Sequence, residues 1–192
     1  MSPLIRFTKT CINVGTYWGQ GVNINSKIIQ GVEYFPPVRV SDERGDFVKL
    51  FSAPWTTIKP WNLEETFYSY SKQGVIRGLH LQTGESENWR LISVIEGDIF
   101  DVLHDLRDES PTNGETTTSY MSKAETSSVL IPPGVAHGFQ AITNCIILYQ
   151  SSKHYVRERD LGINIEAIQI DWPIEPKIMS ARDRNLPMVK NW

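Results

Sequence analysis

The chain has 192 residues, of which 40% are hydrophobic and 21% are charged, so it can form one domain with a sizeable core. Nineteen basic residues against 22 acidic residues give a net charge of −3. A protein that binds the phosphate backbone of nucleic acids normally carries a basic excess, so this composition argues against that class.

The two cysteines, Cys11 and Cys145, have no metal-ligand spacing and cannot form a disulfide framework for a chain of this length. The first residues lack the cationic and apolar regions of a signal peptide. The longest apolar runs are too short to span a bilayer. We therefore expect a soluble, cytoplasmic protein with no membrane partner.

Apolar residues recur mainly with period two or in short runs bounded by Gly, Pro, Asn and Asp, which is typical of β-strands. Short helices are expected only around Ala124–Ser127 and Ser180–Arg184. This pattern predicts an all-β sandwich or barrel, with a jelly roll among the leading folds. Clear strands are expected at Phe67–Ser71, Val75–Leu81, Arg90–Glu96, Ile99–Leu106, Ser128–Ile131, Gly138–Ile142 and Ile146–Ser151.

No repeat, low-complexity tract or linker divides the chain after its first residues. We expect residues 28–192 to form one domain and residues 1–27 to form an N-terminal extension. Two interpretations of this polar extension stay open. It is either an added strand or arm on a neighbouring subunit, or a partly ordered segment.

Residues 132–137 have the form P-x-G-x-x-H, which is one half-motif of metal-binding cupins. In those proteins the histidine joins an H-x-H pair and a carboxylate from an earlier strand. Here the earlier strand reads His80-Leu81-Gln82, so the second imidazole is missing, and His104 lies on another strand. Zinc and iron sites need three or four ligands, so we expect no bound metal.

The strand around His80 is the most informative segment. Alternation predicts Arg77 and Leu79 on one face, and Gly78, His80 and Gln82 on the other. A single histidine in an apolar strand is commonly a core residue. Gly78, however, permits close approach and Arg77 offers a bidentate contact to an anion, so the strand also fits a small-molecule site at a barrel mouth.

Segments in the same order along the chain resemble the dTDP-4-dehydrorhamnose 3,5-epimerase family of nucleotide-sugar cupins. They cover the chain from about Ile28 to Pro187. The resemblance implies a cupin-type double-stranded jelly roll with a few short helices. The segments are DERGDF (42–47), RGLHLQ (77–82), FDVLHDLRDESPT (100–112), IPPGVAHGF (131–139), LYQSSKHY (148–155), IDWP (170–173) and MSARDRNLP (179–187).

The resemblance implies an isomerase that epimerises C3, C5 or both of a nucleoside-diphosphate 4-keto-6-deoxy sugar, in deoxysugar or polysaccharide biosynthesis. The C4 ketone acidifies the neighbouring C–H groups, so a base can remove a proton and an acid can return one on the opposite face. The family pattern assigns His80 as the base and Tyr149 as the acid; the alternative for Tyr149 is a strand aromatic packed in the core. No metal or redox cofactor is required.

The resemblance also implies a set of substrate contacts. Arg77 and Arg90 would supply cations near the enolate oxygen or the diphosphate. Asp105 has a structural interpretation, as an anchor for the turn before Arg107. The implied substrate-binding residues are Arg44, Phe47, Lys49, Arg77, Gln82, Arg90, His137 and Tyr155.

The chain departs from the family at several of these positions. Lys49 stands where the family has a glutamate that helps to read thymine, and Glu65 and Phe67 replace a glutamine and an asparagine. Arg90 replaces a lysine, which keeps the charge and changes the geometry. The changes on the nucleotide side lead to the hypothesis that the base is not thymine, which leaves GDP, CDP and UDP sugars as candidates.

A further departure concerns the carboxylate that orients the histidine. We expect the family to carry it in an Asp-Pro pair before the IDWP segment, where it stabilises the imidazolium. Residues 162–168 contain no Asp-Pro. Glu166 is the nearest carboxylate, and it either replaces that aspartate as a catalytic residue or is an ordinary solvated residue.

Two other functions remain open at this point. A sugar-nucleotide ketoisomerase would use the same enolate chemistry, and a non-catalytic cupin would only bind the sugar nucleotide. We also expect a homodimer with exchanged strands, because open jelly rolls have sheet edges that must be covered and family members pair in this way.

Overall fold

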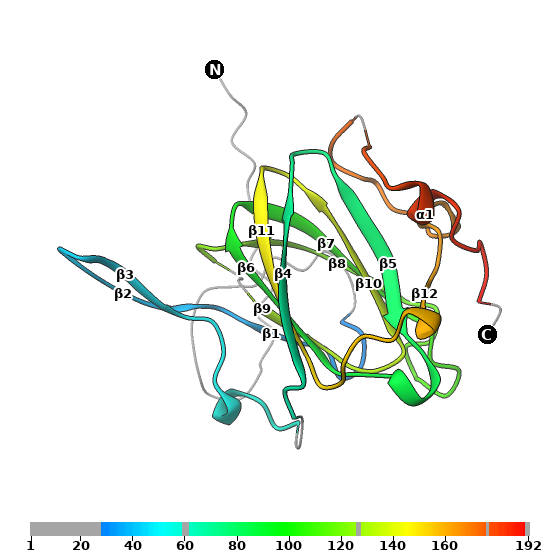
Figure 1. Ribbon diagram of the computed structural model, residues 1–192, viewed down its shortest axis with the longest axis horizontal. Coiled ribbons are helices and arrows are strands. Elements are labelled where there is room, and N and C mark those ends of the chain that lie inside the picture. The colour runs from blue at the N-terminus through cyan, green and yellow to red at the C-terminus, as the bar shows by residue number, and fades with distance from the viewer. Residues whose placement is uncertain (1–27, 59–61, 126–127, 176, 191–192) are drawn as a thin grey trace.

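The computed structural model describes residues 28–58, 62–125, 128–175 and 177–190 (Figure 1). The expectations for the first 27 residues therefore lie outside the described part of the chain. The described strands are β1 Glu33–Phe35, β2 Val38–Asp42, β3 Gly45–Lys49, β4 Glu65–Ser71, β5 Ile76–Gln82, β6 Arg90–Glu96, β7 Asp98–Asp105, β8 Thr116–Ser122, β9 Ser128–Ile131, β10 Val135–Ala141, β11 Cys145–Ser151 and β12 Asp160–Gly162.

The strands form two five-stranded sheets that face each other (Figure 1). The first sheet has the order β1-β9-β6-β11-β4 and the second has the order β12-β5-β10-β7-β8, and all paired strands are antiparallel. This arrangement is the predicted cupin-type jelly roll. The described helices are single turns, at Ala53–Trp55, Gly84–Ser86, Arg157–Arg159, Ile165–Ala167 and Ala181–Arg184.

The main hydrophobic core lies between the two sheets. Ile92 and Ile147 from the first sheet meet Ile99, Leu103 and Phe139 from the second, and each is at most 1% exposed. Alternation along the strands directs these side chains inward, whereas Phe100 and Val102, which lie between them on β7, point to the other face and are buried there in a second apolar cluster. Burial of this apolar surface is the dominant favourable contribution to folding.

The predicted strands are all present, with small shifts at their ends. Arg90–Glu96 and Ser128–Ile131 have the predicted bounds, whereas β10 begins at Val135, three residues earlier than predicted. Of the two predicted helices, Ser180 caps the helix α1 at Ala181–Arg184 by accepting a hydrogen bond from the backbone of Asp183. At the other, residues 124 and 125 are not helical, and residues 126 and 127 lie outside the described residues.

The predicted alternation along β5 is wrong, because the strand changes face at Gly78. This glycine has φ of +102°, and a Cβ there would lie 2.5 Å from the carbonyl oxygen of His137. Beyond Gly78, Leu79 is fully buried beneath the C-terminal segment. Arg77 and His80 consequently line the same cavity, although alternation places them on opposite faces.

The C-terminal segment covers the outer face of the second sheet. Ile163, Ile165 and Ile168 pack on Leu79 and Leu81 of β5, and they form a second buried apolar cluster. Figure 1 shows this segment, in orange and red, lying beside β5 and including α1. The packing brings residues near position 180 to a strand that lies about 100 positions earlier in the chain.

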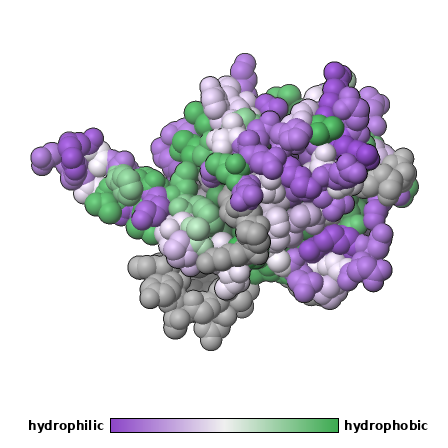
Figure 2. Space-filling view, turned by 60° about the horizontal axis from the view of Figure 1, so that its bottom comes forward, coloured by the Kyte–Doolittle hydropathy of each residue, from purple (hydrophilic) through white to green (hydrophobic). Residues whose placement is uncertain are grey.

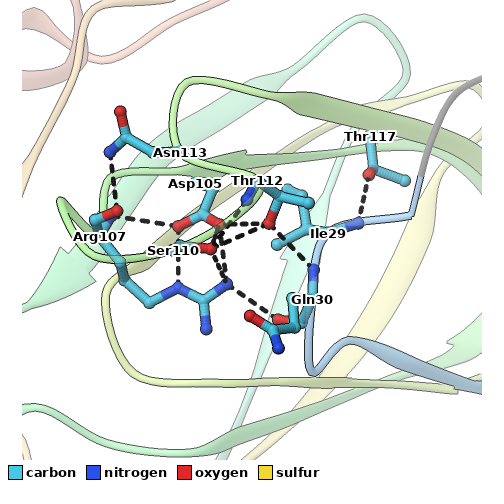
Figure 3. A network of polar contacts seen from close by, with 8 residues as sticks. All are labelled: Ile29, Gln30, Asp105, Arg107, Ser110, Thr112, Asn113 and Thr117. Carbon is cyan, nitrogen blue, oxygen red and sulfur yellow. Dashed lines mark hydrogen bonds and ion pairs between the residues drawn. The ribbon is translucent and has the colours of Figure 1, made fainter.

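A polar network fixes the loop after β7 (Figure 3). The fully buried carboxylate of Asp105 accepts hydrogen bonds from Arg107 Nη2 at 2.7 Å, from Ser110 Oγ at 2.6 Å and from Thr112 Oγ1 at 2.6 Å. Arg107 and Thr112 also bond the backbone of Gln30. Asp105 therefore anchors the turn before Arg107, as its structural interpretation predicts, and ties it to the chain preceding β1.

The hairpin of β2 and β3 projects away from both sheets (Figure 1). Its two strands pair with each other, and Val40 and Phe47 are 59% and 65% exposed. Figure 2 shows apolar residues on the hairpin and at the place where it leaves the body of the molecule. Such an exposed apolar arm is typical of a surface that another chain covers.

No helix among the described residues is long and apolar enough to cross a membrane.

The Asp105 network makes a prediction about acid stability. Burial opposes ionisation of Asp105, but the bonds from Arg107, Ser110 and Thr112 outweigh it and hold its pKa below the ordinary 3.8. Because the folded-state pKa is lowered, its contribution to stability is present above pH 3.8 and is lost as the pH falls further. Asp105→Asn should lower the free energy of unfolding in urea at pH 7 by about 2–4 kcal/mol.

The difference between Asp105→Asn and the wild type should shrink at pH 3. Asp108→Asn is the matched control, because Asp108 is 75% exposed in its side chain and pairs only with Lys190 among the described residues. Its effect should stay below about 0.5 kcal/mol. Equal stability of Asp105→Asn and the wild type at pH 7 would contradict the anchoring role.

Candidate active site

A cavity of about 700 Å³ opens between the two sheets. Its walls come from β4, β6 and β11 of the first sheet, from β5 and β10 of the second sheet, and from the C-terminal segment. Residues that line it and carry chemistry are Glu65, Ser69, Arg77, His80, Gln82, Arg90, His137, Tyr149, Tyr155, Asp160, Arg182 and Asp183.

His80 on β5 pairs with the carboxylate of Asp183. His80 Nε2 lies 2.8 Å from Asp183 Oδ1, and the backbone N–H of Gly78 donates to Asp183 Oδ2 at 3.3 Å. Burial opposes ionisation of Asp183, but the bonds from His80, Gly78 and Ser180 outweigh it and lower its pKa. The carboxylate therefore accepts the Nε2 proton, which leaves Nδ1 of neutral His80 as a base.

Glu166 does not contact His80 and so does not replace the histidine-pairing aspartate. It lies exposed in the first turn of the short helix Ile165–Ala167, where its backbone N–H is capped by Asn164. The pairing carboxylate is Asp183, which lies in the MSARDRNLP segment. The solvated interpretation of Glu166 therefore fits the structure.

Tyr149 stands on β11, in the sheet that faces His80. Its ring stacks on Phe67 with 4.8 Å between centroids and 7° between planes, and its hydroxyl lies 3.3 Å from Ser69 Oγ. Burial raises the pKa of Tyr149 to about 12, against a smaller opposing effect of the Ser69 hydrogen bond. The phenol is thus protonated at neutral pH and can serve as an acid.

Arg90 on β6 places a buried cation in the cavity wall. It donates to the backbone carbonyls of His80 at 3.1 Å and Val135 at 2.7 Å, which join the first sheet to the second. Burial lowers its pKa to about 10, and the charges of Asp160, Tyr149 and Asp101 counteract this. Arg90 therefore remains a cation at neutral pH, and its buried Nε has no partner in the described part of the chain.

A second histidine, His137 on β10, lies opposite His80 in the strand register. Its Nε2 lies 2.7 Å from Asp101 Oδ1 on β7, and the two side chains are 5% and 0% exposed. The cavity thus contains two histidines, each of which has a carboxylate on its Nε2.

The polar end of the cavity contains Gln82 and Tyr155. Gln82 Oε1 accepts the backbone N–H of Val156, while its buried Nε2 has no partner among the described residues. Tyr155 donates to Asp160, which also pairs with Arg182 at 2.7 Å. An unpaired buried donor beside a cationic rim suits a ligand rich in acceptor oxygens.

Arg77 reaches the cavity from the neighbouring part of β5. Its Nε donates to Ser71 Oγ at 2.8 Å and its Nη2 donates to the carbonyl of Tyr70 at 3.1 Å. These bonds hold the guanidinium against the edge strand β4 while the side chain stays exposed to the cavity. Arg77 can therefore present a fixed cation to an anionic ligand.

Three of the predicted substrate contacts are not in the cavity of their own chain. Arg44, Phe47 and Lys49 lie on the projecting β2–β3 hairpin, and all three are exposed. Arg44 forms an ion pair with the neighbouring Asp42. A single copy of the chain therefore brings together His80, Tyr149, Arg77, Gln82, Arg90, His137 and Tyr155, and leaves the hairpin residues apart.

Comparison with known proteins identifies the family. The family model described as dTDP-4-dehydrorhamnose 3,5-epimerase matches residues 26–191. The chain belongs to this family. A dTDP-4-dehydrorhamnose 3,5-epimerase of Methanothermobacter thermautotrophicus is 39% identical over 167 residues, which cover 82% of this chain and 89% of the relative.

Solved structures of the epimerase family agree with this assignment. The Bacillus anthracis enzyme, with TDP and PPi bound, has a TM-score of 0.79 and 29% identity over 88% of this chain and all of the other. The Legionella pneumophila enzyme, in complex with dTDP-4-keto-L-rhamnose, has a TM-score of 0.76 and 29% identity over 87% and 92%. The chain is thus a cupin-fold isomerase of the epimerase family.

Sequence reasoning missed Asp183 and Asp101 as partners of the two histidines. Both lie inside segments that carry the family resemblance, MSARDRNLP and FDVLHDLRDESPT. The signal was present in those motifs, but the pairing with His80 and His137 depends on contacts between distant parts of the chain.

Within the described residues, no group of three or more His, Cys, Asp or Glu side chains could hold a metal ion.

The geometry predicts that substitutions of Asp183 and of Glu166, the two carboxylates considered as partners of His80, have different effects on the catalytic rate. Asp183→Asn removes the charge that stabilises the imidazolium, so kcat should fall by about 10²-fold or more with little change in KM. Glu166→Gln is the matched control and should leave kcat unchanged, because Glu166 lies in solvent. Steady-state kinetics on folded variants tests both, and a kcat of Asp183→Asn within threefold of the wild type would contradict the pairing role.

Proposed function

We propose that this protein epimerises C3, C5 or both of a nucleoside-diphosphate 4-keto-6-deoxy sugar. The observation that carries this proposal is that a base and an acid lie on facing walls of one cavity. His80 lies on the second sheet with Asp183 of α1 on its Nε2, and the protonated phenol of Tyr149 lies on the first sheet. A base and an acid on facing walls are what inversion at carbon requires.

The reaction follows from these positions. Neutral His80 takes a proton from the carbon next to the C4 ketone through Nδ1, and the electron pair of that C–H bond moves into the enolate. Tyr149 then gives its phenolic proton to the opposite face of the same carbon, and the carbonyl re-forms. Solvent returns the proton to Tyr149 and accepts the proton from His80, so the net change is the inversion of one stereocentre.

Two cations support the charge that develops. Arg90 is buried beside His80 and has an unpaired donor, so it can stabilise the enolate oxygen in a region that excludes water. Arg77 is more exposed and can contact the diphosphate. Fixed cations of this kind accelerate the reaction because they need no reorganisation when the charge appears.

We propose that the functional unit is a homodimer in which each β2–β3 hairpin completes the cavity of the other subunit. The exposed apolar residues Val40 and Phe47 support an intermolecular role for the hairpin. Arg44, whose side chain is 85% exposed, would bring a cation to the diphosphate in the partner's cavity. A twofold arrangement then places one hairpin in each of two equivalent sites.

Proton exchange tests the proposed reaction. In deuterated water, the wild type should exchange the C3 or C5 protons of a dTDP-, UDP-, CDP- or GDP-linked 4-keto-6-deoxyglucose, followed by NMR. His80→Asn should lose both exchange and inversion. Tyr149→Phe should keep exchange, because His80 can return a proton to the same face, while epimer formation falls by about 10²-fold.

Tyr68→Phe is the matched control for Tyr149→Phe, because Tyr68 lies on β4 and is 71% exposed. Exchange at C3 alone, with movement of the carbonyl, would identify a ketoisomerase instead. Absence of exchange with all four nucleotides would overturn the proposal and favour a binding protein. A clear preference for the dTDP sugar would refute the hypothesis of a different base.

Subunit complementation tests the proposed dimer. His80→Asn and the double variant Arg44→Ala/Phe47→Ala should each be inactive alone, because one lacks the base and the other lacks the arm. After subunit exchange, half of the dimers are mixed and have one intact site, so about a quarter of wild-type activity should return. A monomeric mass by light scattering, or no return of activity, would contradict the exchange of hairpins.

A further inference from the structure

Phe67 on β4 is an aromatic side chain in the wall of the cavity, and the proposed reaction gives it no role. It lies directly opposite Tyr149 in the pairing of β4 with β11. The two rings stack with 4.8 Å between their centroids and 7° between their planes. Phe67 stands where the family resemblance implies an asparagine, which cannot form this stack. The contact is therefore a feature of this chain's own sequence.

The stack covers the side of Tyr149 that faces the edge of the first sheet. β4 is the outermost strand of that sheet, so no described strand pairs with its other edge. Phe67 is 47% exposed, whereas burial raises the pKa of Tyr149 to about 12. The ring of Phe67 thus stands between the phenol and solvent at this edge, and it helps to keep the phenol protonated.

A second contact fixes the hydroxyl group of Tyr149. Its oxygen lies 3.3 Å from Ser69 Oγ, and Ser69 lines the cavity from the same face of β4 as Phe67. The stack limits the tilt of the phenol ring, and the hydrogen bond limits the position of the hydroxyl. Two alternate residues of one strand therefore hold the acid in one orientation.

Alignment of the phenol matters for inversion and not for removal of the proton. His80 can take a proton and return it to the same face without Tyr149. Inversion requires a phenolic proton that is aimed at the opposite face of the carbon. A misplacement of about 1 Å can lower the rate of such a step by about 10²-fold. Loss of the stack should therefore slow inversion and leave removal of the proton almost unchanged.

We propose that Phe67 is a positioning residue that aligns the phenol of Tyr149 with the carbon to be inverted and shields it from solvent. This inference rests on the proposed function, in which Tyr149 gives the proton to the opposite face. Phe67 acts through Tyr149 and forms no bond to the reacting atoms. It thereby sets how often removal of a proton ends in inversion rather than in return to the same face.

Two substitutions separate alignment from simple filling of space. Phe67→Tyr keeps a benzene ring that can stack on Tyr149. Phe67→Leu keeps apolar bulk at the same place and loses the flat ring. If Phe67 only filled space, the leucine variant would behave like the wild type.

The experiment follows total deuterium incorporation into the sugar and formation of the epimer in one NMR time course, in deuterated water at saturating 4-keto-6-deoxyglucose nucleotide. Phe67→Leu should form the epimer about tenfold more slowly than the wild type. Its deuterium incorporation, which counts return of a proton to either face, should change by less than about threefold, as should KM. Phe67→Tyr should stay within about threefold of the wild type in all three quantities.

Tyr68→Leu is the matched control, because Tyr68 adjoins Phe67 on β4, is 71% exposed and does not line the cavity. It should leave both rates unchanged. The unfolding temperature shows which variants are folded. If Phe67→Leu does not fold, Phe67→Met takes its place, because it also keeps apolar bulk and lacks the ring.

A wild-type ratio of epimer to incorporated deuterium in Phe67→Leu would overturn the inference and leave the proposed function intact. Equal losses of both rates would assign Phe67 to the fold, and a change in KM alone would assign it to ligand binding, so each would also overturn the inference. Absence of exchange in the wild type would overturn the proposed function and this inference together. The failures are therefore distinguishable.

Discussion

The close approach of β5 and β10 is the constraint on which the reactive centre depends. A Cβ on Gly78 would lie 2.5 Å from the carbonyl of His137, and a Cβ on Gly138 would lie 2.6 Å from the carbonyl of Arg77. Both positions must therefore be glycine for the two backbones to touch. This contact sets His80 and His137 opposite each other and turns Arg77 toward the cavity.

The same contact explains why the C-terminal segment is part of the site. Because β5 changes face at Gly78, Leu79 is buried on the outer side of the sheet, where Ile163 and Ile165 cover it. The covering segment then returns along β5 and forms the turn that Ser180 caps. Asp183 in that turn bonds both Gly78 and His80, so packing and catalytic geometry are set by one set of contacts.

Local patterns predicted the strands whose inward positions are apolar. β6 and β9 have the predicted bounds, because each contains a short run of Leu, Ile and Val residues whose side chains are buried on both faces of the sheet. β8 was missed because its inward positions include Thr117 and Ser119, which are fully buried although polar. Alternation of hydrophobicity cannot reveal a strand whose buried side chains are hydroxylic.

The individual residues that carry the chemistry of the site could be predicted from the sequence. His80, Tyr149 and Arg90 meet in one cavity, as the family resemblance implies. The partner of His80 was not predictable by proximity in sequence, since Glu166 is nearer the expected position and Asp183 is the residue in contact. A pairing across 103 positions depends on how the last segment packs, which no local pattern encodes.

In the proposed reaction, a sugar carbon lies between His80 and Tyr149. A crystal structure with a bound nucleoside-diphosphate 4-keto-6-deoxy sugar, or an unreactive analogue, tests this most directly. We expect His80 Nδ1 and the Tyr149 hydroxyl to lie on opposite faces of C3 or C5, each within about 3.5 Å of that carbon. A sugar bound with both groups on one face, or with neither in reach, would contradict it.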